Sequence, residues 1–169
     1  KQLAREFNFG YLDTGAAYRA LAWLTLNGLD ESELVTGEFE KKFDYEISTN
    51  PDNFWVKVGG RDVTDAIRSN QVSEAVSSVA RYPSVRSFMK RKTHEIAESC
   101  TKSGIVIEGR DITTVVYPNA QSRILLTASE EVRLARRSIL TMGLAALAGP
   151  VRADPVADFY RGKTLTVLI

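Results

Sequence analysis

The chain opens with a switch from a strand-like to a helix-like pattern of apolar residues. Tyr11-Leu12 forms a short apolar run, and after Asp13-Thr14-Gly15 the apolar period becomes helical from about residue 16 to residue 26. Gly28 stands where a helix C-terminal cap belongs. The pattern predicts a strand that ends at Leu12 and leads directly into a helix.

A β-hairpin and two helices are predicted next. Between Phe43 and Val58, apolar residues at alternate positions flank the polar turn Asn50-Pro51-Asp52-Asn53, and Gly59-Gly60 forms a second turn. From Thr64 to about Thr101 the period is helical. Pro83 divides this stretch into two helices, because proline is not tolerated in a helix interior.

Two apolar runs further along predict strands of a sheet. Ile105-Val106-Ile107 is apolar throughout and stops before Gly109, as expected of a strand buried on both faces. Arg123–Ala128 forms a similar run, and Ser129-Glu130-Glu131 after it is a good helix start. Strands and helices that alternate in this way predict an α/β fold, with the hairpin as an insertion.

Composition narrows the chemistry that these 169 residues can carry. The formal charge of +1 excludes a protein that coats nucleic acid through excess positive charge. The single cysteine, Cys100, excludes an internal disulfide, and the single histidine, His94, excludes a paired-histidine zinc site; we assign neither a function. No stretch reaches the roughly 18 apolar residues of a membrane span. The sequence predicts a soluble domain that works with carboxylates, arginines, hydroxyls and backbone amides.

Charged residues become sparse after about residue 137. Arg136-Arg137, a mostly apolar stretch from Ser138 to Ala148 and then Val151-Arg152-Ala153 follow the three-part pattern of a bacterial secretory signal. The same residues also fit an amphipathic helix followed by a loop and a last strand from Thr164 to Ile169. The pattern alone favours neither interpretation.

Two strand ends carry residues suited to binding an anion. After one strand, Arg110 can hold a phosphate and Asp111 can accept from a sugar hydroxyl or a base amine. After the other strand comes Thr14, and the helix that follows carries Tyr18 and Arg19. Taken singly, Gly-Arg-Asp could be a surface turn, Thr14 a helix cap and Tyr18 a packing residue. Two strand ends with one arginine each favour an anion pocket.

Several separate motifs resemble, in order and spacing, those of bacterial cytidylate kinase. They are Tyr11-Leu-Asp-Thr-Gly-Ala-Ala-Tyr-Arg19, Asp62-Val-Thr-Asp-Ala-Ile-Arg68, Val72-Ser73, Val79-Ala-Arg-Tyr-Pro-Ser-Val-Arg86 and Glu108-Gly-Arg-Asp-Ile-Thr-Thr-Val-Val-Tyr-Pro118. The resemblance covers about residues 1–137. It implies an α/β fold with the parallel sheet of a P-loop nucleoside monophosphate kinase, helices on both faces and a CMP-binding insertion at about residues 38–100.

The resemblance also implies an activity and a set of binding residues. The family transfers the γ-phosphoryl group of ATP to CMP or dCMP with Mg²⁺, in cytoplasmic pyrimidine nucleotide metabolism. The implied partner is therefore a small nucleotide, with no nucleic acid and no membrane. The positions that match residues on the phosphate side of the family's CMP pocket are Thr14, Arg19 and Arg110. The positions that match residues reading or supporting the cytosine are Ser77, Arg86 and Asp111. Tyr18 lies within the first motif.

Parts of the family pattern are absent from these residues. No G-x-x-x-x-G-K-[ST] loop, which would cradle the phosphates of ATP, occurs in the sequence, so no catalytic residue is identified. The arginine-rich lid is missing beyond Arg133, Arg136 and Arg137 near its start, and Thr113 replaces the usual glycine after Gly-Arg-Asp-Ile. We therefore expect a truncated kinase without activity; a non-catalytic remnant that binds CMP is an alternative.

Residues 138–169 resemble a different family. Together with the signal-like stretch, the segment from Ala153 to Ile169 is similar to the start of a periplasmic tripartite-tricarboxylate-transporter receptor. The chain is interpreted as a partial cytidylate kinase domain, residues 1–137, fused to an unrelated segment, residues 138–169. A fragment of an exported solute-binding protein is the remaining alternative.

The last segment carries one further prediction about the sheet. In adenylate-kinase-like folds the strand before the P-loop is central, and these residues do not include it. Thr164-Leu-Thr-Val-Leu-Ile169 is apolar, β-branched and of suitable length. We expect Leu165–Ile169 to fill that position parallel to Ile105–Ile107; a separate tail beyond Gly149 is the alternative.

Overall fold

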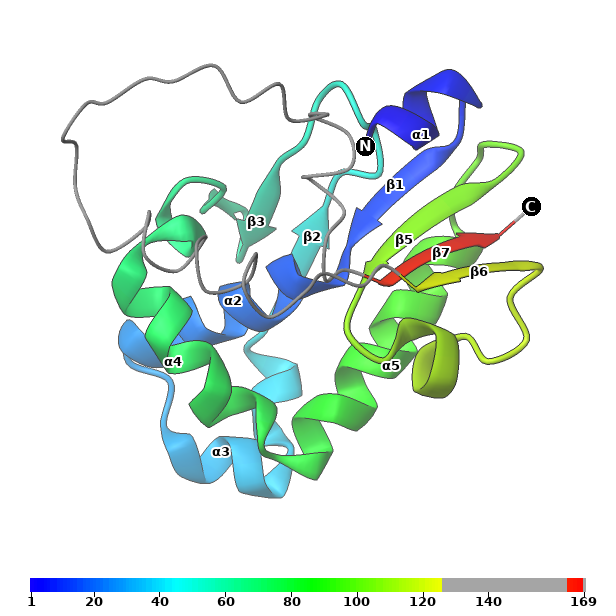
Figure 1. Cartoon of the computed structure of the whole chain (residues 1–169). Coiled ribbons are helices and arrows are strands. Elements are labelled where there is room, and N and C mark those ends of the chain that lie inside the picture. Colours follow the sequence, from blue (N-terminus) through cyan, green and yellow to red (C-terminus); the bar gives the residue numbers. More distant parts are fainter. Residues whose placement is uncertain (126–163, 169) are drawn as a thin grey trace, which may run out of the picture.

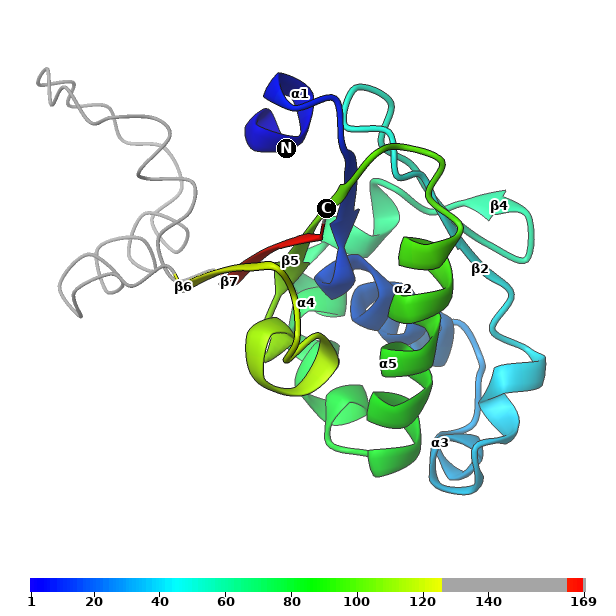
Figure 2. The same cartoon turned by 90° about the vertical axis from the view of Figure 1, so that its right-hand side faces the viewer.

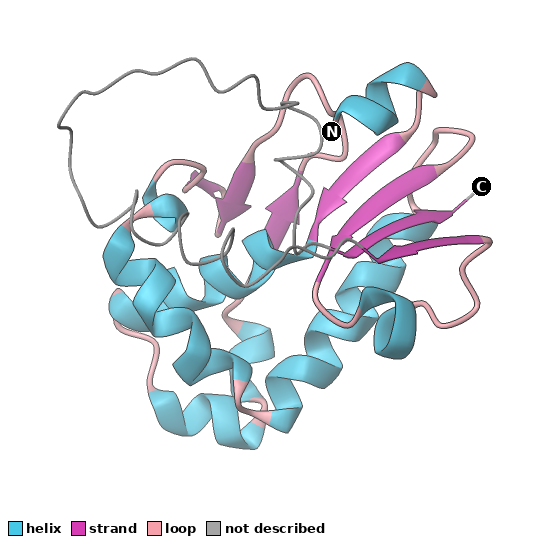
Figure 3. Cartoon of the chain, viewed as in Figure 1, coloured by secondary structure: helices cyan, strands magenta, loops and turns pink. Residues whose placement is uncertain are grey.

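The computed structural model describes residues 1–125 and 164–168 (Figure 1). Figure 3 shows the strands in two groups, with most of the helices packed beneath them in that view. In chain order the elements are α1 (Gln2–Glu6), β1 (Gly10–Asp13), α2 (Thr14–Leu26), α3 (Glu31–Thr36), the 3-10 turn η1 (Glu38–Lys41), β2 (Tyr45–Ile47), β3 (Val56–Val58), β4 (Arg61–Asp62), the 3-10 turn η2 (Ala66–Arg68), α4 (Asn70–Ala80), α5 (Pro83–Glu98), β5 (Ile105–Gly109), the π-helical turn η3 (Ile112–Val116), β6 (Ser122–Leu125) and β7 (Thr164–Leu168).

The larger sheet has the strand order β1-β5-β7-β6, and helices cover both of its faces. β1 and β5 are parallel, as a crossover connection through the helices requires. Side chains of Leu12 and Ile107 pack with Ile96 of α5, whereas Tyr11 and Val106 point the other way and pack with Ala4 of α1. Figure 2 shows α1 and α5 on opposite sides of these two strands. The predicted α/β fold is confirmed.

β7 lies between β5 and β6, drawn in red in Figure 1. The last segment therefore enters the sheet as expected, but the expected parallel direction is wrong. β7 is antiparallel to β5, with Ile105 opposite Leu168, and antiparallel to β6, with Leu125 opposite Thr164. Because β6 ends at the edge where β7 begins, the chain can return antiparallel without crossing the sheet, whereas a parallel strand needs a crossover connection.

The predicted hairpin is present as an antiparallel pair, β2 and β3, with Tyr45 opposite Val58. Gly59 and Gly60 form the second predicted turn, which joins β3 to β4; their φ angles of 56° and 73° lie in the left-handed region that favours glycine. Pro83 is the first residue of α5, where its fixed φ and missing N–H suit a helix start.

The end signals of α2 are those of a standard helix. The side chain of Asp13 caps the helix by accepting from the backbone N–H of Gly15 at 3.0 Å, so the alternative of Thr14 as the cap does not hold. Gly28 follows the helix with a φ of 109°, as its predicted role at the C-terminal end requires. The short helix α3 was not predicted, although Asp30 and Glu33 form a capping box at its start.

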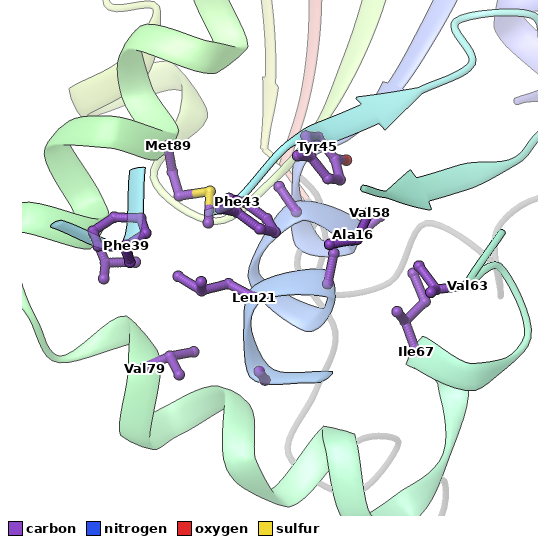
Figure 4. Packing of buried hydrophobic residues seen from close by; sticks show 14 of the residues in the cluster. Ala16, Leu21, Phe39, Phe43, Tyr45, Val58, Val63, Ile67, Val79 and Met89 are labelled. Carbon is purple, nitrogen blue, oxygen red and sulfur yellow. The ribbon is translucent and has the colours of Figure 1, made fainter. Parts of the chain in front are cut away.

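A large apolar core joins α2, α4, α5 and the hairpin. Figure 4 shows Leu21 of α2 lying among Phe43, Val79 and other buried side chains. Leu21 is fully buried, and burial of such a side chain contributes about 1.5–3 kcal/mol. This packing fixes the relative positions of α2 and α5, the helices that carry Tyr18 and Arg86.

Several sequence predictions lie outside the described residues. They are the helix start at Ser129, the arginines Arg133, Arg136 and Arg137, the boundary near residue 137, the signal-like stretch and the receptor-like residues before Thr164. Within residues 1–125 and 164–168, no helix is both long and apolar enough to cross a membrane.

Candidate functional site

The two strand-end motifs meet at the carboxyl ends of β1 and β5. These strands end side by side, with Asp13 opposite Glu108. Thr14 is buried and donates a hydrogen bond from Oγ1 to the carbonyl oxygen of Glu108 at 3.0 Å. A Cβ at Gly109 would collide with this hydroxyl, so only glycine allows so close an approach. The two strand-end motifs, which the sequence predicts to share one anion pocket, therefore lie side by side.

The loop after β5 presents two of the predicted binding residues. Arg110 and Asp111 are both exposed. Asp111 has a φ of 55°, a left-handed conformation that aspartate adopts more readily than most residues. Its carbonyl oxygen accepts from the backbone N–H groups of Val115 and Val116, at 2.9 and 3.2 Å. The backbone of this loop is therefore ordered while its two charged side chains face solvent.

Tyr18 brings together three parts of the predicted site. Burial raises the pKa of the Tyr18 hydroxyl, Arg86 opposes this shift and Asp111 adds to it. Coulombic influence of this kind requires proximity. Arg86 on α5 and Asp111 after β5 thus both lie near a hydroxyl carried by α2. The charges of Arg86 and Asp111 both act on the Tyr18 hydroxyl.

Arg86 has an additional structural role that was not foreseen. Its Nη1 donates to the carbonyl oxygens of Ala80 and Arg81, at 3.1 and 2.8 Å. These are the last carbonyls of α4, where the helix dipole favours a cation. A guanidinium has five N–H groups, so the Nε and Nη2 donors of Arg86 remain for another partner.

The other predicted residues have no such links. Ser77 is exposed on α4, and Arg19 is half-buried on α2. Within the described part of the chain, the side chains of Arg19, Ser77 and Arg110 make no hydrogen bond or ion pair. The structure therefore connects Thr14 to the loop after β5, but within the described residues no side-chain hydrogen bond or ion pair joins Arg19 or Ser77 to the other predicted residues.

Sequence reasoning gave no role to two acidic residues at this edge. Asp13 and the buried Glu108 face each other across the ends of β1 and β5. Burial raises the pKa of the Tyr45 hydroxyl well above its usual range, and the Asp13 carboxylate adds to this shift. The only sequence signal was their position at strand ends, and their pairing depends on a register that no local pattern fixes.

Two cavities lie away from this edge. One, of about 710 Å³, is lined by residues that include Trp55, Asp62 and Asp65, and another, of about 270 Å³, by residues that include Cys100 and Tyr117. None of the seven predicted site residues lines either cavity. In the described ranges, no group of three or more histidine, cysteine, aspartate or glutamate side chains could hold a metal ion.

Comparison with known proteins identifies the family. The family model described as cytidylate kinase matches residues 1–142. Cytidylate kinase of Exiguobacterium sibiricum is 45% identical over 139 residues, and that of Bacillus subtilis 41% identical over 141; each match covers 81% of this chain and 61% of the relative. The chain thus spans less than two thirds of the length of these relatives.

A longer match extends over more of the chain. The bifunctional pantoate ligase/cytidylate kinase of Synechococcus elongatus is 36% identical over 174 residues, which covers 95% of this chain and 32% of that protein. The resemblance read from the motifs is confirmed for the part that the family model covers. The chain belongs to the cytidylate kinase family.

Proposed function

We propose that these residues form the CMP-binding part of a cytidylate kinase, the enzyme that phosphorylates CMP or dCMP in cytoplasmic pyrimidine metabolism. The observation that carries the proposal is the Thr14–Glu108 hydrogen bond, which brings the two strand-end motifs to one edge of the sheet. In open α/β sheets, ligands bind beyond the carboxyl ends of strands. Membership of the cytidylate kinase family is the reason for proposing CMP as the ligand.

Two arginines, Arg110 and Arg19, are proposed to hold the phosphate of CMP. Arg110 is exposed in the loop after β5, and its guanidinium can bind phosphate oxygens through two parallel hydrogen bonds. Arg19 adds a second positive charge from α2. The single hydroxyl proton of Thr14 is donated to the carbonyl oxygen of Glu108, so Thr14 is proposed to position this edge of the sheet beside the phosphate.

The cytosine is assigned to Asp111, Arg86 and Ser77. Cytosine presents an amino donor beside ring nitrogen and carbonyl acceptors, so a carboxylate and an arginine can distinguish it from uracil. Asp111 supplies the acceptor, and the Nε and Nη2 groups of Arg86 supply donors. Electrostatic coupling of both side chains to the Tyr18 hydroxyl supports their proximity.

The phosphoryl donor requires groups that these residues do not provide. ATP and Mg²⁺ need a phosphate cradle, and the 169 residues contain no G-x-x-x-x-G-K-[ST] loop. No group identified in these residues holds the phosphates of ATP, so we assign no transfer step to them. We propose that the 169-residue polypeptide by itself binds CMP without phosphorylating it.

Calorimetric titration with CMP tests this proposal. We expect saturable binding that Arg110→Ala weakens by roughly 1.5–3 kcal/mol, the scale of a hydrogen bond to a charged group. Arg61→Ala is the matched control, because Arg61 is an exposed arginine that lies over the Trp23 ring and is not among the residues proposed to bind CMP. Equal CMP affinities for the wild-type chain and Arg110→Ala would remove Arg110 from the site.

A further inference from the structure

His94 connects helix α5 to the segment that follows the Gly-Arg-Asp loop. Its Nε2 lies 2.9 Å from the carbonyl oxygen of Val116. Because a carbonyl can only accept, Nε2 carries the proton and donates it. The imidazole also stacks on the ring of Tyr117, with a centroid distance of 4.1 Å and an interplanar angle of 21°. One side chain thus holds both the backbone of Val116 and the ring of the next residue.

Val116 belongs to the same turn as Asp111. The N–H groups of Val115 and Val116 donate to the carbonyl of Asp111, and that of Tyr117 donates to the carbonyl of Ile112 at 2.7 Å. These bonds close η3 on itself, with Asp111 at its start and Val116 at its end. A restraint on the Val116 carbonyl therefore also restrains the backbone of Asp111.

The loop that presents Arg110 and Asp111 is held at both ends. Before it, Thr14 donates to the carbonyl of Glu108, and after it, His94 donates to the carbonyl of Val116. Arg110 and Asp111 are exposed and contribute no buried packing that could fix their positions. Asp111 moreover adopts a left-handed φ, which costs about 1–2 kcal/mol relative to right-handed backbone for a non-glycine residue. The anchors at the loop ends add to the hydrogen bonds within the turn in holding this conformation.

We propose that His94 is a positioning residue for nucleotide binding: it fixes the turn from Asp111 to Val116 and thereby the direction of Arg110 and Asp111, without touching the ligand. This inference rests on the proposed CMP site. It assigns a role to the single histidine of the chain, to which the sequence pattern assigns none.

The test combines amide hydrogen exchange with CMP affinity in three variants. His94→Phe keeps an aromatic ring for stacking on Tyr117 but removes the donor. We expect exchange at Val115, Val116 and Tyr117 to become up to about tenfold faster, and the Kd for CMP to rise by about three- to tenfold, as loss of one hydrogen bond allows. His94→Gln keeps an N–H donor and should restore both values in large part. Lys90→Ala, an exposed change on the same helix, should alter neither.

Two outcomes would overturn the proposal. Unchanged exchange at residues 115–117 together with unchanged CMP affinity in His94→Phe would show that the hydrogen bond holds nothing. Exchange that accelerates equally throughout α5 and β5, with no rescue by His94→Gln, would show a general structural role. Failure of the proposed function gives a different result, in which exchange responds to His94→Phe but Arg110→Ala leaves CMP affinity unchanged.

Discussion

The hydroxyl of Thr14 donates a hydrogen bond of 3.0 Å to the backbone carbonyl of Glu108, 94 positions later in the chain. Both residues are buried, at 8% and 4% exposure, so water cannot replace the bond. It ties the start of α2 to the end of β5, and it thereby sets the spacing between the two motifs of the candidate site. A buried acceptor left without a donor costs about 1–3 kcal/mol.

Thr14→Val should therefore lower the free energy of unfolding by about 1–3 kcal/mol, because valine keeps the shape of threonine and removes the donor. Thr14→Ser keeps the hydroxyl and should cost less. Urea denaturation of the two variants measures the difference. Equal stabilities for the two would contradict a structural role for the hydroxyl.

Gly109→Ala should destabilise the protein by about 1–3 kcal/mol, as overpacking does, because the added Cβ collides with Thr14 Oγ1. The double variant with Thr14→Ala removes the atom that Cβ meets. In a double-mutant cycle, the cost of Gly109→Ala should shrink when Thr14 is already alanine. An unchanged cost would place the strain elsewhere in the loop.

Elements with a local signal could be predicted from the sequence, and those set by distant pairing could not. The span of α2 follows from its apolar period and Gly28, and the start of α5 from Pro83. The six-residue helix α3 is too short to show a period, and its capping box at Asp30 and Glu33 was the only signal. The direction of β7 depends on where β6 ends, which no residue of β7 encodes.

In the candidate site, the sequence motifs identified the candidate residues but did not predict which contacts these residues make in the folded chain. The positions of Thr14 and Asp111 at strand ends were predicted because strands and turns have local patterns. The hydrogen bonds of Arg86 to the end of α4 were not, because they depend on the packing of two helices. The same holds for the contact of His94 with Val116, which spans 22 positions.

Val167→Pro tests whether β7 holds the sheet together. Val167 lies between Val106 of β5 and Ser122 of β6, and proline there removes an N–H from a strand paired on both sides. We expect Val167→Pro to lower the free energy of unfolding by about 3 kcal/mol or more, by analogy with proline in a helix interior. Val167→Thr keeps the backbone N–H, so it should retain most of the free energy of unfolding.

The direction of β7 has its own measurement. Cross-strand nuclear Overhauser effects should connect Ile105 with Leu168 and Gly109 with Thr164, as antiparallel pairing requires. Contacts between Ile105 and Leu165 instead would support a parallel strand. Full stability of Val167→Pro would show that β7 does not contribute to the sheet.

The hydroxyl of Tyr117, the stacking partner of His94, should lose its proton at a higher pH than an ordinary tyrosine. Burial raises the pKa of Tyr117 to about 12, and the Glu98 carboxylate adds to this shift. Because the folded protein holds this proton more tightly, the resulting stability is present below the ordinary pKa of 10 and is lost as the pH rises through about 12. An ultraviolet absorbance titration should show a tyrosinate transition near pH 12 that Tyr117→Phe removes. A transition assigned to Tyr117 at its ordinary pKa would contradict the burial of its hydroxyl.

The 169-residue polypeptide should make no CDP from ATP, Mg²⁺ and CMP above background, because it contains no P-loop. A coupled assay for nucleoside diphosphate measures this, with a complete cytidylate kinase as positive control. Turnover at about 1 s⁻¹, the low end of typical enzymes, would show that the phosphates of ATP are held by other groups.

The location of CMP binding tests the central claim most directly. In a heteronuclear NMR titration of the chain with CMP, the amides of Thr14–Arg19 and Gly109–Ile112 should shift together and saturate with one Kd. UMP at the same concentrations should cause smaller changes. Shifts confined to the cavity beside Trp55 and Asp62, with residues 14–19 and 109–112 unmoved, would contradict a nucleotide site at the carboxyl ends of β1 and β5.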